Sequence, residues 1–476
     1  INKIKQERKE KMKKRIISKS LAVIMLIAGL GGCSIGGKQT SSGQYETSIV
    51  VGNWPTSQKT AQLEAKNAIK DNYMKKYPNI EIIPDTWSYD VNTFLPKATS
   101  NQLPTTYPTF FTEVKKIAEA GYAADVTEKM KEYGYTDSIG DDIKSLVSYD
   151  GKMYAVPTDA YVMGLYVNMN LFKEAGLVND DGTPIIPQTY DEMMETAKTI
   201  KEKTGKAGFA IPTMKNYGGW QFMNLAWSYG VNFMEEIDGK WTATFNSPEC
   251  IEALKYLRDL KWEHNAMPEN ALIDLDELIK LYSTDQVAMV FEDPGYFNKQ
   301  IVSTYKMDKA AVAMGSVPAG PGGRFALLGG SVTMISPAAT EEQIDACFKW
   351  YDEVGFSPNA DVDTAVKNKE NQCRIDSEEG YIVGPIVYEL FPDSEVSKKC
   401  REVVDKYTNV DMKFFAEYTD FDRVTVRQEE SQNCQELYRI LDSCIQKVLT
   451  DKDADVAAVV EQAANDFQTN YLDKIN

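Results

Sequence analysis

Histidine is almost absent from this sequence, which holds a single one, His264, in 476 residues. A metal centre with several histidine ligands, or a catalytic pair of histidines, is therefore excluded by count. Cysteine is also sparse: there are seven, and no two of them have the Cys-x-x-Cys spacing typical of zinc sites. We expect no metal and no cofactor. The six cysteines after Cys33 permit disulfides by their even number, but their irregular spacing favours small buried apolar side chains.

Positive charge is in deficit as well, with 52 Lys and Arg against 70 Asp and Glu and a formal net charge of −18. Such a surface repels polyanions, so we expect no nucleic-acid partner. The glycine-rich stretch 320–323 is not followed by Gly-Lys-Ser/Thr, which argues against a nucleotide-phosphate loop. What remains is a globular composition, 43% hydrophobic and 26% charged, whose length predicts more than one domain.

The N-terminal 33 residues have the three parts of an export signal. A cationic segment at 13–19 precedes an apolar run at 21–30, and small residues then lead to Cys33. The run is shorter than the roughly 20 residues that a membrane span requires.

The residues before Cys33, Leu30-Gly31-Gly32, resemble the bacterial lipobox, in which the cysteine is acylated and becomes the new N-terminus. We expect residues 1–32 to be a signal peptide. A more usual signal peptide would begin at Met12, so residues 1–11 could be an artefact of where the sequence was taken to start. Residues 33–44 would then be a lipidated cysteine and a flexible tether. The alternative is an ordinary signal peptide with an incidental cysteine.

Strand and helix patterns alternate along the rest of the chain. A β-branched run at 47–52, a helical pattern at 57–76 and a second short strand at 80–83 predict a βαβ unit and hence a parallel sheet. Helix starts are predicted at Thr189, Ser247 and Thr340. From about 430 the pattern is helical throughout. The fold class is therefore α/β with an α-rich C-terminal part.

Residues 150–177 (DGKMYAVPTDAYVMGLYVNMNLFKEAGL) resemble the signature of the family 1 extracellular solute-binding proteins. These are sugar-binding lipoproteins of ABC importers, and maltose-binding protein belongs to the same structural group. Further similar segments follow in the family's order at 187–192, 285–289 and 317–331. The family usually has Gly-Pro-Trp after the 285–289 segment, whereas this chain has Asp293-Pro294-Gly295-Tyr296.

The resemblance implies a two-lobe fold of the periplasmic-binding-protein type, in which the chain crosses between lobes several times and the lobes close on a ligand by hinge motion. The expected N-terminal lobe comprises residues 45–157 and 312–358. The expected C-terminal lobe comprises residues 158–311 and 359–476.

The resemblance also implies ligand-binding residues, since sugars stack on aromatic rings and their hydroxyls need fixed polar partners. Trp54, Trp220 and Tyr296 could instead be core residues, and the stacking ring near 296 could be Phe297. The implied ligand-binding residues are Asn53, Trp54, Thr112, Glu113, Asp159, Trp220, Glu292, Asp293, Tyr296, Gly330 and Ser331.

The function that this resemblance implies is non-catalytic capture of a carbohydrate, most simply an oligosaccharide, and its delivery to ABC transporter permease subunits. We expect a monomer, lipid-anchored on the outer face of the bacterial cell membrane. Two alternatives stay open. One is a lipid-anchored glycoside hydrolase that uses Asp159 with Glu292 or Asp293 as its paired carboxylates. The other is a binder of peptides or polyamines, with which the acidic composition is compatible.

Overall fold

The computed structural model describes residues 45–384 and 388–475. The predicted signal peptide, Cys33 and the predicted tether fall in residues 1–44, outside this part of the chain. Across the two described ranges, no helix is both long and apolar enough to cross a membrane.

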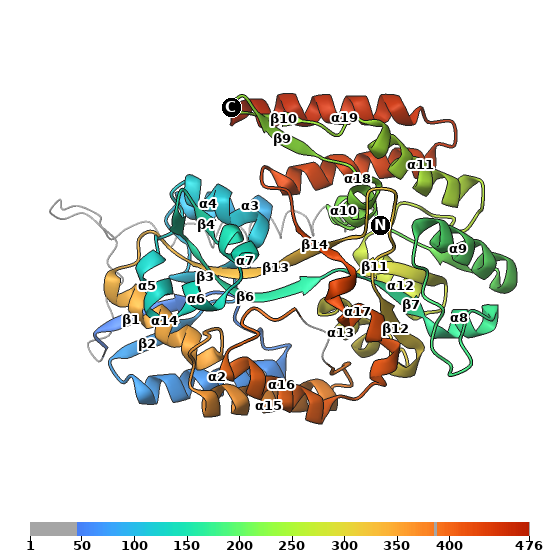
Figure 1. The fold of residues 1–476 in the computed structure, drawn as a ribbon. Coiled ribbons are helices and arrows are strands. Elements are labelled where there is room, and N and C mark those ends of the chain that lie inside the picture. Colours follow the sequence, from blue (N-terminus) through green and yellow to red (C-terminus); the bar gives the residue numbers. More distant parts are fainter. Residues whose placement is uncertain (1–44, 385–387, 476) are drawn as a thin grey trace, which may run out of the picture. The chain divides into compact units, whose positions relative to one another are not determined.

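The strands and helices of Figure 1 confirm the mixed α/β class. The strands are β1 (Thr47–Val51), β2 (Ile80–Pro84), β3 (Thr106–Phe110), β4 (Ser148–Tyr149), β5 (Lys152–Met153), β6 (Ala155–Val162), β7 (Gly164–Asn168), β8 (Ala207–Phe209), β9 (Met234–Ile237), β10 (Lys240–Ala243), β11 (Val287–Glu292), β12 (Val312–Gly315), β13 (Phe325–Ile335) and β14 (Thr425–Gln428). The helices are α2 (Thr60–Lys76), α3 (Val91–Thr99), α4 (Val114–Glu119), α5 (Thr127–Glu132), α6 (Tyr135–Ser138), α7 (Asp141–Leu146), α8 (Met169–Ala175), α9 (Tyr190–Thr204), α10 (Tyr217–Tyr229), α11 (Pro248–Trp262), α12 (Leu275–Ser283), α13 (Tyr296–Ser303), α14 (Glu341–Val354), α15 (Val362–Glu378), α16 (Glu395–Tyr407), α17 (Ala416–Thr419), α18 (Cys434–Thr450) and α19 (Val456–Asn470). Five short 3₁₀ turns complete the described chain: η1 (Phe111–Glu113), η2 (Lys309–Ala311), η3 (Met412–Phe414), η4 (Phe421–Arg423) and η5 (Leu472–Lys474).

The larger sheet has six strands, and it contains the predicted βαβ unit. β1 pairs in parallel with β2 and, at one position, with β3. The long strand β13 runs antiparallel to β3, and β14 pairs with its first residues in parallel. On its other side β13 pairs antiparallel with β6, with a register shift between Ser331 and Val332. The long antiparallel pair of β6 and β13 supplies residues to the cavity described below.

A second sheet of four strands has the order β12-β7-β11-β8. β7 follows β6 after a single residue, Met163, so the chain passes directly from the larger sheet into the smaller one. It returns to the larger sheet between β12 and β13. The first passage, at Met163, comes four residues after the predicted seam at 154–159, and the second, at 316–324, overlaps only the end of the predicted seam at 310–318.

The expected lobe limits stay a prediction, but strand and helix packing differ from them at two places. β12 starts at Val312, where the N-terminal lobe was expected to resume, yet it pairs with β7 of the smaller sheet. α15 and α16 follow residue 359, where the C-terminal lobe was expected to resume, yet α15 packs on α14 and α2. The sheet to which β12 belongs is decided by its pairing with β7, which lies far away in the sequence. The sequence pattern around residue 312 does not encode this pairing.

The predicted helix starts are present. The Ser247 side chain accepts a hydrogen bond from the Cys250 backbone, with Pro248 in the first turn, and Thr340 with Gln343 forms a complete capping box. Thr189 also caps its helix, but Glu192 accepts from the Gln188 backbone rather than from Thr189. The cysteines after Cys33 are all unpaired, and five of the six are buried.

Candidate ligand-binding site

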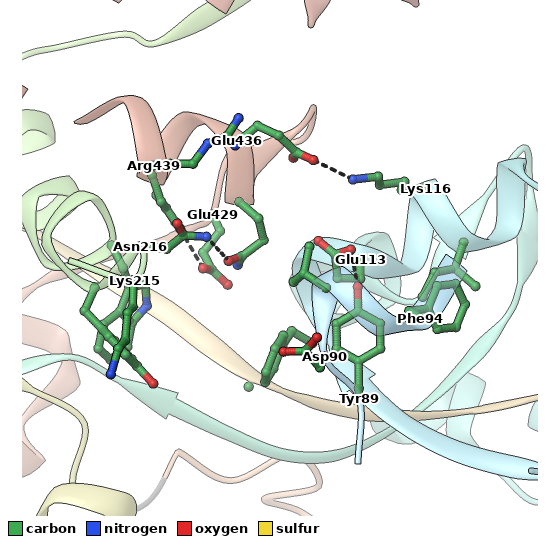
Figure 2. A pocket seen from close by; sticks show the side chains of 18 of the residues that line it. Tyr89, Asp90, Phe94, Glu113, Lys116, Lys215, Asn216, Glu429, Glu436 and Arg439 are labelled. Carbon is green, nitrogen blue, oxygen red and sulfur yellow. Dashed lines mark hydrogen bonds and ion pairs between the residues drawn. The ribbon is translucent and has the colours of Figure 1, made fainter. Parts of the chain in front are cut away.

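A cavity of about 1090 Å³ lies among side chains of α3, α4, β6, α10, β13 and α18. Its lining therefore comes from elements far apart in the sequence. Figure 2 shows Tyr89, Phe94 and Glu113 on one side, facing Lys215, Asn216 and Arg439 on the other. Ligand pockets of proteins typically measure roughly 300–1,000 Å³, so this cavity is slightly larger than that range.

Aromatic rings line both sides of the cavity. Trp220, on the first turn of α10, meets Tyr161 of β6 edge-on at 6.2 Å between ring centroids and Tyr217 at 6.3 Å. On the opposite side Tyr89 packs against Phe94 at 5.3 Å and against Phe110 at 5.7 Å. Trp220 is half-buried, so part of its ring is accessible from the cavity. Such rings offer apolar faces to the C–H side of a sugar.

Three carboxylates in the cavity wall accept hydrogen bonds from neighbouring groups. Glu113, 3% exposed, accepts from the Tyr89 hydroxyl at 2.6 Å, and burial raises its pKa. Glu429 accepts from the Tyr438 hydroxyl at 2.6 Å. Burial raises the pKa of Glu429 to about 7, so this carboxyl is partly protonated near neutral pH.

The third carboxylate, Asp293, caps α13 by accepting from the Gly295 and Tyr296 backbones at 2.7 and 3.0 Å. Its pKa is also raised by burial. The Tyr161 hydroxyl lies near this acid and near Glu429, and burial together with these negative charges raises its pKa.

The three cationic residues of the lining are engaged with other side chains. Lys116 pairs with Glu436 at 2.8 Å, and the dashed line in Figure 2 marks this contact between α4 and α18. Lys215 pairs with Asp274 at 2.8 Å. The Arg439 guanidinium lies over the Tyr471 ring, 5.8 Å from its centroid. The lining also carries five acids, so its charge balance is negative.

Five of the eleven predicted ligand-binding residues line the cavity: Glu113, Trp220, Asp293, Tyr296 and Gly330. Of the two candidate stacking rings, Tyr296 and Phe297, it is Tyr296 that lines the cavity. Tyr296 is 48% exposed, whereas Phe297 is fully buried against Tyr166 and Tyr282. A β-carbon on Gly330 would lie 2.4 Å from Asp159 O and from the Phe111 ring, so only glycine fits there.

Four other predicted residues lie next to the lining rather than in it. Asp159 accepts from the Ser331 backbone at 3.1 Å, beside Gly330. Asp159 has a large accessible area, yet the protein around it disfavours its charge enough to raise its pKa. Thr112 accepts from the lining residue Gln435 at 3.4 Å. Asn53 accepts a hydrogen bond at 2.8 Å from Ser88, the residue that precedes the lining residue Tyr89.

Two predicted residues are buried instead. Trp54 is 4% exposed, stacks on Trp350 at 5.9 Å and donates to Asn67, so the core alternative is correct for its side chain. Its two partners belong to α14 and α2, which pack against the side chain. Glu292 is fully buried and accepts from Gln221 at 2.6 Å, with a pKa raised well above its usual range by burial.

Sequence reasoning missed several lining residues. Tyr161 lies inside the 150–177 signature and could have been singled out as an aromatic next to Asp159. Glu429, Tyr438 and Arg439 lie in the C-terminal segment, where the helical pattern carried no sign of a site. Within the described ranges, no three His, Cys, Asp or Glu side chains are grouped to hold a metal ion.

The profile of the bacterial extracellular solute-binding proteins matches residues 54–354, which is most of the described chain. The chain belongs to this family of binding proteins, and not to a family of enzymes. The matched range includes Glu113, Trp220, Asp293 and Tyr296 but ends before Glu429 and α18.

Individual relatives of the chain share only a low sequence identity with it. A binding protein of Brucella abortus is 27% identical over 197 residues, which cover 41% of this chain and 45% of that protein. The chain thus aligns with less than half the length of this curated relative.

Among solved structures, maltose-bound MalE3 of T. maritima has a TM-score of 0.64 at 18% identity, covering 89% of this chain and 99% of that one. UgpB of Mycobacterium tuberculosis, solved with glycerophosphocholine, has a TM-score of 0.67 at 16% identity, covering 90% and 98%. At such identities the likeness shows the fold.

Proposed function

We propose that this protein captures a carbohydrate, an oligosaccharide rather than a single sugar, in the cavity and delivers it to the permease of an ABC transporter. It would do so as a monomer held by a lipid on Cys33 at the outer face of the bacterial cell membrane. The observation that carries the proposal is the lining itself. A large cavity is walled by aromatic rings on two sides and edged by carboxylates that can accept hydrogen bonds from hydroxyls.

The cavity volume supports an extended solute. At about 1090 Å³ it exceeds what one small solute would fill. Rings on both sides, from Trp220 to Phe110, could stack on successive sugar units. Tyr296, at the rim, is exposed enough to add a further ring.

The charge balance argues against phosphorylated solutes such as the glycerophosphocholine bound by UgpB of Mycobacterium tuberculosis. An anionic ligand needs a cation that is free to pair with it. Here Lys116 and Lys215 are already in ion pairs, and five acids line the same space. A neutral solute with many hydroxyls avoids this repulsion.

The same excess of carboxylates favours a second candidate, a cationic solute such as a polyamine or a basic peptide. Among residues 45–384 and 388–475, no cation is a hydrogen-bond partner of Glu113, Asp293 or Glu429. A bound amine would compensate these charges and lower the raised pKa values. The abundance of accessible rings makes the sugar the first choice.

The test is a thermal-shift screen of residues 34–476. The panel would contain gluco-, xylo-, arabino- and chito-oligosaccharides, with spermidine and glycerol 3-phosphate as charged comparisons. A ligand at about 100 times its Kd adds about 2.7 kcal/mol of stability. With an unfolding entropy of about 2.1 cal/mol/K per residue, this raises the Tm by about 3 °C for a chain of this length.

A shift with one class of oligosaccharide, with the sugar recovered uncleaved, supports the proposal. A shift with spermidine alone would replace it by the cationic solute. A shift with glycerol 3-phosphate alone, or none with any oligosaccharide, would overturn it. Trp220→Ala serves as the matched control because tenfold weaker binding should reduce a shift that arises in the cavity to about half.

A further inference from the structure

The N-terminus of α10, in the cavity wall, has no cap from the side chain of its own N-cap residue. Lys215 and Asn216 both have left-handed backbones, with φ of 61° and 73°, which side chains other than glycine rarely adopt. The helix has no side-chain cap from Asn216 and no acid in its first turn. Yet this turn presents Lys215, Asn216, Tyr217 and Trp220 to the cavity.

The missing cap comes from another helix. Asp442 of α18 accepts hydrogen bonds from the Asn216 and Gly219 backbones, each at 2.8 Å. Its side chain is 4% exposed. The carboxylate therefore binds the free N–H groups that begin α10, where a negative charge is favoured by the helix dipole.

Close packing makes this contact possible. A β-carbon on Gly219 would lie 2.3 Å from the Tyr438 carbonyl oxygen of α18. One on Gly218 would lie 2.7 Å from the Asp442 carboxylate. Two glycines in succession thus let α10 approach α18, while Tyr438 itself holds Glu429 in the cavity wall.

The arrangement costs free energy at neutral pH. Burial raises the pKa of Asp442 to about 6, although its backbone hydrogen bonds act in the opposite direction. No ion pair joins Asp442 to a described residue of α10, α11 or α19. The nearest cations along α10 and α18 are engaged elsewhere: Lys215 with Asp274, Arg439 with Tyr471, and Lys447 with Asp451.

We propose that Asp442 is a positioning residue of the ligand site: its ionised carboxylate holds the first turn of α10 so that Tyr217 and Trp220 face the solute. The proposal concerns the positioning of side chains in the same cavity and rests on the proposed function for its effect on binding. It follows that replacing the Asp442 carboxylate loosens the turn and that affinity falls with it.

A first experiment needs no ligand. Backbone hydrogen exchange of the full chain is followed by mass spectrometry between pH 5 and 7.5, corrected for intrinsic exchange rates. In the wild type, the N–H groups of Asn216 and Gly219 should exchange about tenfold more slowly than in Asp442→Asn, because the carboxylate accepts both of them. In Asp442→Asn, the protection should be low at every pH. The Asn side chain has one oxygen and one NH₂ group, so one of the two backbone N–H groups would face another donor.

Asp455→Asn is the matched control. Asp455 caps α19 by accepting from the Ala458 backbone at 3.2 Å, and it does not line the cavity. This variant should keep the wild-type exchange profile at 216–219. A purely structural role for Asp442 would lower protection across α18 and the core, not at one turn.

Wild-type exchange at residues 216 and 219 that is as fast as in an unstructured peptide would overturn the proposal, and this arm requires no variant to fold. Equal protection in Asp442→Asn and wild type would overturn it as well. The oligosaccharide panel is then repeated with both variants at pH 7.5 and 5. If no sugar shifts any variant while the exchange results hold, the proposed function fails and the positioning of α10 stands.

Discussion

Replacing Trp54 by alanine separates a core tryptophan from a cavity tryptophan. The Trp54 indole stacks on Trp350 at 5.9 Å with an interplanar angle of 24°, and it donates to Asn67 at 3.3 Å. Lys66 lies 5.4 Å from its ring centroid, in surroundings that lower the pKa of that amine by burial. The substitution therefore opens a cavity in the core and removes three contacts at once.

The expected loss of stability follows from these contacts. A buried Trp→Ala change typically costs about 3–5 kcal/mol, which includes the cavity. The unfolding entropy of roughly 430 residues is about 0.9 kcal/mol/K, so a loss of about 4 kcal/mol lowers the Tm by about 4–5 °C. Ligand affinity should stay within about twofold, because Trp54 does not line the cavity.

Trp220→Ala is the comparison variant in the same assay. Its ring is half-buried and meets Tyr161 and Tyr217 edge-on, so the Tm should fall less than in Trp54→Ala, whose ring is buried. Ligand should bind more than about tenfold more weakly, a loss of roughly 1.4 kcal/mol. Calorimetric titration and thermal melts of both variants measure the two quantities. If Trp54→Ala weakened binding while Trp220→Ala only destabilised the fold, the assignment of these two side chains would be refuted.

Three further predictions concern the cavity wall and the core. Glu429 has a folded-state pKa near 7, above its unfolded value, so wild-type stability should fall as the pH rises from about 4.5 to 7. In Glu429→Gln, the free energy of unfolding measured with urea should lack this dependence on pH, which amounts to at most about 3 kcal/mol. The same pH dependence in variant and wild type would contradict a buried carboxyl at this position. Gly219→Ala should lower the free energy of unfolding by about 1–3 kcal/mol and weaken ligand binding, because its β-carbon would meet the Tyr438 backbone. Gly121→Ala is its control: the added methyl group has no atom within 4 Å, so this variant tests the strain of a positive φ alone. A thiol titration in denaturant should find the cysteines after Cys33 all reduced, and added reductant should leave the Tm unchanged, because they are unpaired in the folded chain.

The resemblance at 150–177 and the alternating pattern predicted more of the fold than of the site. β1, α2 and β2 form where β-branched and helical spacings predict them, and Ser247 and Thr340 cap the expected helices. These features depend on residues within one or two turns of each other. The passage of β6 into β7 is equally local, since it occurs within one extended segment.

The site was predicted only in part because its side chains come from distant segments. Tyr438 holds Glu429, and Tyr89 holds Glu113, through contacts that no spacing within one element encodes. Nothing in the C-terminal helical pattern indicated that one face of α18 lines a cavity.

The sequence by itself determined the α/β class, several helix starts and which residue types are available for binding, because these depend on local periodicity and composition. It identified the family through the motifs that begin at 150–177. Only the tertiary structure decided which member of each neighbouring pair faces the cavity: Asp293 rather than Glu292, and Tyr296 rather than Phe297. Consecutive residues have the same sequence context, but the end of a strand and the first turn of a helix point them in different directions. Packing against α10, α12 and β7 then buries one and leaves the other accessible.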